Sequence, residues 1–248
     1  MTGSASGIGL ATRKMLEAAG DRVIGVDLAG QEIDADLSRP EDRAQAVDSV
    51  VEACDGVLDG IVLAAGVGPD KPPRLIGAVN YFGVIEVADG LLEALARGSA
   101  PSAVVIGSNS GTITPMEDIA AVEFMLEGDE AAALDAIADQ YGAIVYGLSK
   151  LAVGRAVRHR ARRWGAAGVR LNAIAPGPVS TPLLDGIYET EGLGDAVKAL
   201  PIPYGAAVEP EQIAAIIGFL MSDAAAPIHG SVVYADGGTD ALVRPDSY

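Results

Sequence analysis

The sequence alternates short apolar segments with longer amphipathic ones, and this alternation limits the folds that the chain can adopt. Strands are expected at 22–27, 32–36, 60–65, 102–108, 169–175 and 231–235. Amphipathic helices are expected at 8–19, 40–54, 75–97, 145–165 and 209–222. The strands are mostly apolar, as parallel strands are when helices cover both faces of their sheet. The pattern predicts right-handed β–α–β units in a doubly wound, Rossmann-like α/β sheet, as a single domain over 1–248.

Two stretches interrupt the alternation. Residues 113–142 have the pattern of two acidic helices broken near Gly128. Residues 178–208 hold four prolines among apolar side chains, and a long irregular segment of this kind is typical of a substrate lid. The alternative for this second stretch is a surface excursion that packs on the core.

The charge balance disfavours two classes of partner. The chain has 34 acidic and 17 basic residues, a formal charge of −17 at pH 7, whereas nucleic acids and anionic membranes attract positive charge. One helix carries a run of arginines, which in an acidic protein is expected to be a solvated face paired with carboxylates. These arginines are Arg155, Arg158, Arg160, Arg162 and Arg163.

Few side chains are suited to cross-links or metal ions. Cys54 is the only cysteine, which excludes an internal disulfide, and the two histidines, His159 and His229, disfavour a histidine-built metal site. The sequence contains no pattern of a secretory signal and no run of 18 uncharged apolar residues, so a soluble cytoplasmic protein is expected.

Residues 2–9 form a glycine-rich segment that leads directly into a helical pattern. Glycines allow the backbone to approach a pyrophosphate, which binds the free N–H groups at a helix N-terminus. Asp27 ends the next strand, about 20 residues further on, where a carboxylate accepts hydrogen bonds from the adenosine ribose. Its negative charge would repel a 2′-phosphate, so NAD is favoured over NADP. The alternative is an aspartate that faces solvent at a strand end.

The glycine segment should follow a strand, but only Met1 precedes it. That strand would be central in the sheet, where it pairs on both edges, and its loss would destabilise the fold. We therefore expect the first strand to be missing from this chain and the natural start to lie upstream of Met1.

Tyr146 and Lys150 stand four residues apart at the start of a helix, on one face. A phenol has a pKa near 10, and a nearby ammonium and an oxidised nicotinamide would lower it. Such a pair is common on protein surfaces, but Ser108 ends a strand, where ligand-binding loops begin, and its hydroxyl could stabilise a carbonyl oxygen. Asn80 lies within a helix, where its alternative role is an amide bonded to water or backbone.

The ordered set Thr2-Gly3-x3-Gly7-Ile8-Gly9, Asp36-Leu37, Asn80, Ser108, Tyr146-x3-Lys150 and Pro176-Gly177-x3-Thr181 resembles the short-chain dehydrogenase/reductase superfamily. The resemblance extends from residue 2 to about residue 238. More narrowly, the segments 7–20, 79–83, 163–177 and 236–245 resemble the bacterial 3α-hydroxysteroid dehydrogenase/carbonyl reductase group.

The resemblance implies an NAD-dependent oxidoreductase in which Tyr146 is the general acid–base and Lys150 holds the nicotinamide ribose and lowers the pKa of Tyr146. Ser108 would orient the substrate oxygen, and Asn80 would support a proton-relay water. The residues expected to bind NAD are Gly3, Ser6, Gly7, Ile8, Gly9, Asp27, Leu28, Asp36, Leu37, Ala64, Ala65, Gly66, Tyr146, Lys150, Pro176, Gly177, Val179 and Thr181.

The sequence departs from the superfamily pattern at two places. Leu63-Ala64-Ala65-Gly66 replaces the usual Asn-Asn-Ala-Gly, so side-chain contacts of that motif are lost. The acidic stretch 113–142 separates Ser108 from Tyr146 by 38 residues, much further than in most relatives. We expect this insertion to block the dimer interface that relatives build on the Tyr146 helix, so that 209–222 and 231–235 form the contacts of a homodimer or homotetramer.

The candidate substrate pocket is mostly apolar, which suits a bulky hydrophobic ligand. Its expected residues are Ile113, Met116, Leu183, Leu184, Ile187, Tyr188, Leu193, Val197 and Leu200. A steroid-like alcohol or ketone is the first expectation and another apolar secondary alcohol the second, although the same leucines could simply be core. A non-catalytic NAD(H)-binding sensor or scaffold is the alternative class. A serine hydrolase is disfavoured because Ser108 lacks a Gly-x-Ser-x-Gly turn.

Overall fold

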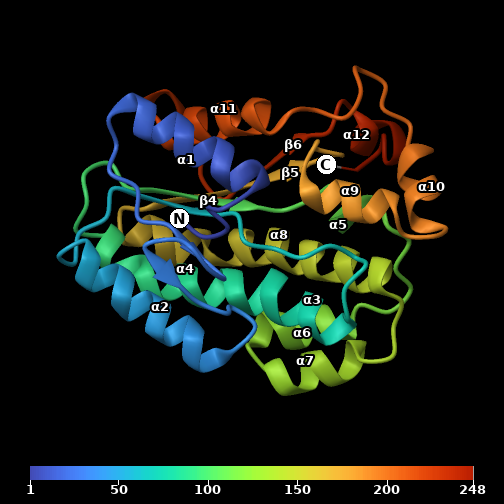
Figure 1. The fold of residues 1–248 in the computed structure, drawn as a ribbon, viewed down its shortest axis with the longest axis horizontal. Coiled ribbons are helices and arrows are strands. Elements are labelled where there is room, and N and C mark those ends of the chain that lie inside the picture. Colours follow the sequence, from blue (N-terminus) through green and yellow to red (C-terminus); the bar gives the residue numbers. More distant parts are fainter. Residues whose placement is uncertain (248) are drawn as a thin grey trace.

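The computed structural model describes residues 1–247, and all of its strand pairs are parallel (Figure 1). The strands are β1 (Val26–Asp27), β2 (Ile33–Asp34), β3 (Gly60–Leu63), β4 (Ser102–Ile106), β5 (Arg170–Pro176) and β6 (Val232–Ala235). β1 pairs with β2, and the other four pair in the order β3-β4-β5-β6. The expected doubly wound parallel sheet is therefore present, with every strand shorter than or equal to its predicted length.

Thr2 joins the two groups of strands. It forms parallel bridges to Val26 on one side and to Leu63 on the other. The Thr2 N–H donates to the Val62 carbonyl at 2.9 Å, and the Val26 N–H donates to the Met1 carbonyl at 2.8 Å. Residues 1–3 thus lie between β1 and β3, where the sequence predicts a central strand.

Helices cover both faces of the sheet (Figure 1). On one face α1 (Gly7–Ala19) packs against α11 (Pro210–Met221), and on the other lie α2 (Pro40–Ala53), α4 (Gly83–Leu95) and α8 (Gly142–Ala166). Local signals set these ends: α1 stops at Gly20, whose φ is 98°, and α2 begins at Pro40, where a missing N–H is harmless.

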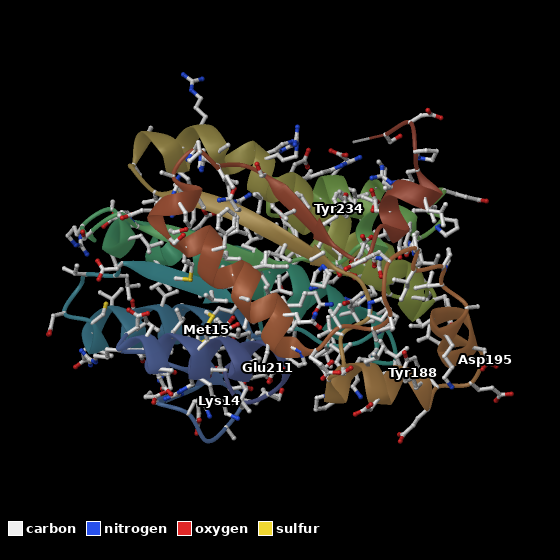
Figure 2. The ribbon with its side chains drawn as sticks, turned by 90° about the horizontal axis from the view of Figure 1, so that it is seen from above. Lys14, Met15, Tyr188, Asp195, Glu211 and Tyr234 are labelled. Atoms are coloured by element: carbon white, nitrogen blue, oxygen red, sulfur yellow. The ribbon has the colours of Figure 1, made fainter. Side chains whose placement is uncertain are left out.

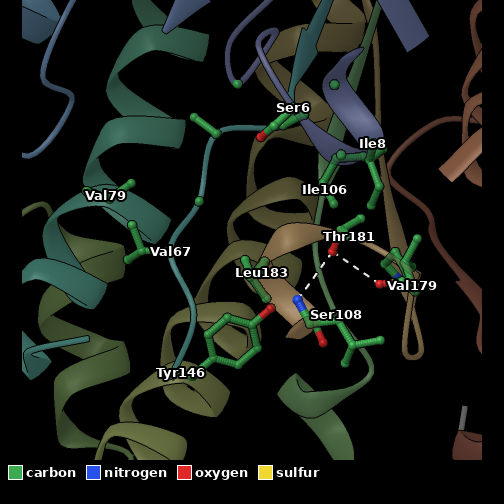
Figure 3. Close-up of a pocket in the computed structure, with 18 of the residues that line it drawn as sticks. Ser6, Ile8, Val67, Val79, Ile106, Ser108, Tyr146, Val179, Thr181 and Leu183 are labelled. Atoms are coloured by element: carbon green, nitrogen blue, oxygen red, sulfur yellow. Dashed lines mark hydrogen bonds between the residues drawn. The ribbon is translucent and has the colours of Figure 1, made fainter. Parts of the chain in front are cut away.

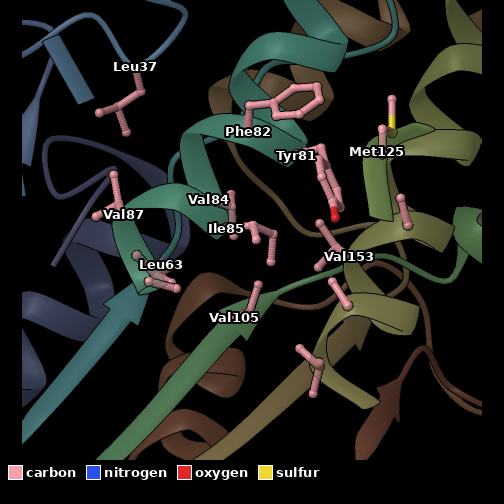
Figure 4. Packing of buried hydrophobic residues seen from close by; sticks show 14 of the residues in the cluster. Leu37, Leu63, Tyr81, Phe82, Val84, Ile85, Val87, Val105, Met125 and Val153 are labelled. Atoms are coloured by element: carbon pink, nitrogen blue, oxygen red, sulfur yellow. The ribbon is translucent and has the colours of Figure 1, made fainter. Parts of the chain in front are cut away.

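Alternate strand residues enter two separate cores, as a period of two requires. Leu63, Val105 and Ala173 belong to the cluster under α4 and α8 (Figure 4), whereas Val62 and Val104 belong to the cluster under α11. The segment expected as one helix at 75–97 is α3 (Pro73–Gly77), a π-helical turn (Ala78–Phe82) and α4. It is long and apolar enough to cross a membrane by composition, but its most apolar 18-residue window is 72% buried inside the protein.

The acidic stretch forms the two helices that the sequence predicts. α6 (Ala120–Glu127) and α7 (Glu130–Ile137) are separated by Gly128, whose φ is 80°. α6 packs on α8 and α7 packs on α3, so the pair adds an outer layer to one side of the molecule. We refer to α6 and α7 together as the insertion.

Most of the remaining elements lie at the carboxyl end of the sheet. α5 (Ser110–Ile113) follows β4, and α12 (Thr239–Val243) follows β6. The stretch 178–208 was expected to be irregular but contains α9 (Pro182–Tyr188) and α10 (Leu193–Lys198). A 3₁₀ turn at Asp223–Ala225 follows α11 at the opposite, amino end of the sheet, where Arg170 at the start of β5 donates to the Ala225 carbonyl at 3.2 Å.

The arginines of α8 pair largely as predicted. Arg155 pairs with Glu123 of the insertion at 3.1 Å, and Arg160 and Arg163 pair with Asp89 of α4 at 2.8 and 3.2 Å. These contacts tie α8 to both neighbouring helices.

Candidate active site

The carboxyl ends of the parallel strands surround a cavity of about 460 Å³. This volume lies within the usual range of small-molecule sites, ~300–1,000 Å³. Every residue that the sequence predicts to bind NAD lines the cavity, as do Ser108, Tyr146 and Lys150. Within residues 1–247, no group of three His, Cys, Asp or Glu side chains is placed to hold a metal ion.

The glycine segment passes closer to its neighbours than any other residue type would allow. A Cβ on Gly9 would lie 1.9 Å from the Gly3 carbonyl oxygen, and one on Gly3 would lie 2.5 Å from the Ala65 nitrogen. The first hydrogen bond of α1 runs from the Leu10 N–H to the Ser6 carbonyl at 3.0 Å. The N–H groups of Gly7, Ile8 and Gly9 therefore precede the helical ladder and lie at the cavity, in a first turn without acidic side chains. This end of α1 fits a pyrophosphate.

Two carboxylates stand beside this turn. The Asp27 carboxylate accepts hydrogen bonds from the Ala5 N–H at 2.9 Å and from the Leu28 N–H at 2.8 Å, which fixes it against the glycine segment. Asp36 accepts from the backbone and hydroxyl of Ser38 at 3.0 and 2.7 Å. Both aspartates line the cavity.

Three polar side chains line the other end, and two of them, Ser108 and Tyr146, are seen in Figure 3. The Ser108 hydroxyl donates to the Ser110 hydroxyl at 3.1 Å and accepts from the Ser110 N–H at 3.1 Å. The Tyr146 hydroxyl points toward Ser108. The Lys150 ammonium donates to the Ile106 carbonyl at 3.0 Å and lies 5.6 Å from the centre of the Tyr146 ring. Residues 108, 146 and 150 are thus brought together as expected.

The stretch 178–208 covers this end with apolar side chains. The Thr181 hydroxyl begins α9 by accepting from the Leu184 N–H at 3.4 Å, and it donates to the Val179 carbonyl at 3.1 Å (Figure 3). The expected pocket residues that do line the cavity are Leu183, Leu184, Ile187, Val197 and Leu200. Val67, Leu75 and Val79 also line it, and they were not predicted, because an apolar side chain in a loop or an amphipathic helix carries no local signal of a cavity.

Four of the residues expected in the substrate pocket do not line the cavity. Met116 packs against the main core, and Leu193 is itself buried. The Tyr188 ring instead contacts the Lys198 ammonium, 5.1 Å from its centre, near the edge of the molecule (Figure 2). Ile113 lies on α5, which packs against α8.

Comparisons with known proteins agree with this geometry. Residues 129–240 match a family model described as enoyl-(acyl carrier protein) reductase. The chain is 42% identical over 254 residues to the 3-alpha-hydroxysteroid dehydrogenase/carbonyl reductase of Comamonas testosteroni, covering 100% of this chain and 98% of that protein. It is 30% identical to the coniferyl-alcohol dehydrogenase of Pseudomonas sp. (strain HR199 / DSM 7063), covering 96% and 94%. The crystal structure of the 3-alpha-hydroxysteroid dehydrogenase from Pseudomonas sp. B-0831 complexed with NADH superimposes with a TM-score of 0.96, at 45% identity over 100% of this chain and 98% of that one.

The chain belongs to the short-chain dehydrogenase/reductase family. This confirms the resemblance inferred from its motifs.

Asn80, which the family resemblance places in a proton relay, does not line the cavity of this short-chain dehydrogenase/reductase. Its side chain is buried; its amide oxygen accepts from the Val67 N–H at 2.8 Å, and its amide nitrogen donates to the Val67 carbonyl at 3.0 Å. A Cβ on Gly66 would lie 3.3 Å from this amide oxygen and 3.8 Å from the Lys150 ammonium. The Asn80 side chain therefore fixes the turn after β3 against Lys150.

Burial changes the proton affinities of both catalytic candidates. Burial lowers the pKa of Lys150 from 10.5 to about 8, because the ammonium is withdrawn from water. Burial also raises the pKa of the Tyr146 phenol, and the Ser108 hydroxyl beside it offsets only part of that rise. The lowering of the Tyr146 pKa expected from Lys150 together with an oxidised nicotinamide stays a prediction.

We predict that Lys150→Met changes the pH dependence of stability. The folded chain binds the Lys150 proton less tightly than the unfolded chain, so the wild type gains stability as pH rises from about 8 toward 10.5. Relative to Lys150→Met, that gain amounts to roughly 3 kcal/mol over this window. Urea unfolding without cofactor, from pH 7 to pH 10, measures it. The exposed Lys14 provides the control: the difference in unfolding free energy between the wild type and Lys14→Met should not change with pH. A flat difference for Lys150→Met would contradict the prediction.

Proposed function

We propose that this protein is an NAD(H)-dependent oxidoreductase that interconverts a hydroxyl and a ketone on a hydrophobic, steroid-like substrate. The observation that carries the proposal is the meeting of Tyr146, Ser108 and Lys150 at one end of a cavity whose other end holds Asp27. Relatives over the full length of the chain bear the names of hydroxysteroid dehydrogenases, and one of them was crystallised with NADH.

The cavity fits a dinucleotide along its length. The N–H groups at the start of α1 would hold the pyrophosphate, Asp27 the adenosine ribose, and Asp36 with Leu37 the adenine. Lys150 would hold the nicotinamide ribose, and the nicotinamide end would contact Pro176, Gly177, Val179 and Thr181. When bound, the nicotinamide accepts or supplies the hydride.

Tyr146 acts as the general acid–base in the proposed reaction. In the oxidation, the substrate carbon loses a hydride and the substrate oxygen loses a proton, which passes to the Tyr146 oxygen; the reduction reverses both transfers. Ser108 donates a hydrogen bond to the same substrate oxygen and steadies its developing charge. The Lys150 ammonium favours the phenolate form of Tyr146, while Asn80 holds the turn at which a relay water would bind.

The apolar wall of the lid favours the steroid-like substrate. Leu183, Leu184, Ile187, Val197 and Leu200 offer a large apolar surface without a charge to bind a small polar alcohol. Other apolar secondary alcohols are the second candidate class for the same reason. Formation of NADH at 340 nm with steroid alcohols, compared with small alcohols, separates them, and the absence of substrate-dependent NADH formation would leave only a cofactor-binding protein.

We also propose a cytoplasmic homodimer or homotetramer that uses α11 and β6 as its interface. Phe219 of α11 is 47% exposed and Tyr234 of β6 is 36% exposed, and both elements lie uncovered on one face (Figure 2). The insertion packs on α8, the helix that many relatives use for dimerisation.

Phe219→Glu should convert the oligomer to a monomer, because it places a charge in the apolar contact. Size-exclusion chromatography with light scattering measures the mass, and Arg158→Glu on the exposed face of α8 is the control that should keep the oligomer. A monomeric Arg158→Glu with an oligomeric Phe219→Glu would place the interface on α8 instead.

Tyr146→Phe should lower kcat by at least about 100-fold, the usual contribution of a general acid–base, while the Kd for NADH changes little. Steady-state kinetics and fluorescence titration of NADH measure the two effects. Tyr141→Phe removes an exposed phenol from the N-terminal end of the same helix and should leave both unchanged. Full turnover by Tyr146→Phe would rule out its role as acid–base.

Asp27→Ala should narrow the preference for NAD over NADP by about 10-fold or more. The Asp27 carboxylate would accept hydrogen bonds from the ribose of NAD and would repel the 2′-phosphate of NADP, and the variant loses both effects. The ratio of kcat/KM values for the two cofactors measures this. Asp34→Ala is the matched control, since Asp34 is the partner of Asp27 in the neighbouring strand and lies outside the cavity. An unchanged ratio in Asp27→Ala would remove the assigned ribose contact.

A further inference from the structure

Arg43 is a buried cation that no step of the reaction uses. It lies on α2, and its side chain is only 1% exposed. One guanidinium nitrogen donates both to the Leu37 carbonyl at 3.3 Å and to the Glu130 carboxylate at 3.2 Å, and a second donates to the same carboxylate at 2.5 Å. The third, Nε, lies 2.8 Å from the Glu86 carboxylate. Arg43 thus connects the insertion, through Glu130, with a backbone group of the cofactor cavity.

A guanidinium withdrawn from water needs its counter-charges, since an unpaired buried charge strongly destabilises a fold. Glu130 supplies the better protected pair, because its side chain is 21% exposed while that of Glu86 is 46% exposed. Glu130 also accepts two parallel hydrogen bonds from Arg43. This bidentate arrangement both stabilises the ion pair and restricts the orientation of the guanidinium. The orientation of Arg43 therefore depends chiefly on the insertion.

Leu37 is the residue that this pair holds in place. It lines the cavity beside Asp36, is itself buried, and packs closely against α4: a Cβ on Gly83 would lie 3.0 Å from the Leu37 Cβ. Figure 4 shows Leu37 beside the helix that carries Phe82, whose ring lies 5.9 Å from the Arg43 guanidinium. With its side chain held by α4 and its carbonyl held by Arg43, Leu37 has one position at the cavity wall.

We propose that Arg43 and Glu130 are positioning residues for the adenine half of the cofactor. The insertion, acting through this buried ion pair, fixes the segment 36–37 and so sets the affinity of the cavity for adenosine. The proposal rests on the proposed function, in which this cavity binds NAD(H). It gives the insertion a role in cofactor binding in addition to its position over α8.

The test replaces Glu130 by Gln and titrates the full-length variant with NADH, ADP-ribose and nicotinamide mononucleotide by calorimetry. The Kd for NADH and for ADP-ribose should rise about 10-fold, whereas that for nicotinamide mononucleotide should not change. KM for NAD should rise with kcat unchanged at saturating NAD, the pattern of a lost binding contact. Asp135→Asn is the matched control: it breaks an ion pair between α7 and Arg74 that does not reach the cavity, and its Kd values should equal those of the wild type.

A second variant separates positioning from stability. The double change Arg43→Leu/Glu130→Leu replaces the buried pair by apolar side chains, which often keep or improve stability. It cannot hold the Leu37 carbonyl, so its Kd for ADP-ribose should rise as in Glu130→Gln even where its Tm is restored. Wild-type Kd values in both variants would overturn the proposal and leave the proposed function intact. A wild-type protein that binds neither NADH nor ADP-ribose would overturn both.

Discussion

Parallel pairing of the strands is the constraint on which the rest of the structure depends. Because β3, β4 and β5 run in one direction in register, the residues that follow them emerge at one edge of the sheet. Gly66, Ser108 and Gly177, which are far apart in the sequence, therefore line one cavity. The close approach of Gly3 and Gly9 brings the N-terminus of α1 to the same edge, so binding groups and reactive groups share one space.

Burial gives the site its electrostatic character and also imposes a cost. The Lys150 ammonium lies out of water with the Ile106 carbonyl as its hydrogen-bond acceptor, and this environment lowers its pKa. The same withdrawal from water raises the pKa of Tyr146, because the phenolate is also a charged form. A fold that needed only stability gains nothing from burying these two groups together, and this is one reason why we assign both to the proposed reaction.

The insertion is tied to the rest of the fold by ion pairs. α6 covers α8 and pairs with it through Glu123 and Arg155, while α7 supplies Glu130 to the buried Arg43. The latter contact joins residues 87 positions apart in the chain. An acidic protein has many surface carboxylates. The one on Glu130 differs from most of them because it pairs with a buried cation next to the cavity.

The sequence by itself determined the alternation of strands and helices, the glycine segment and the spacing of Tyr146 and Lys150, because each of these depends on neighbouring residues. It also determined the family, because the family motifs keep their order and spacing along the chain. It also predicted the break between the two helices of the insertion at Gly128. The backbone there is left-handed, a conformation that glycine adopts most readily. Only the tertiary structure decided that the Asn80 amide bonds to Val67, that Met116 and Tyr188 lie outside the cavity, and that Arg43, on the buried face of α2, meets Glu130. Burial and ion pairing depend on which distant segments come together, and a local sequence pattern does not identify those segments.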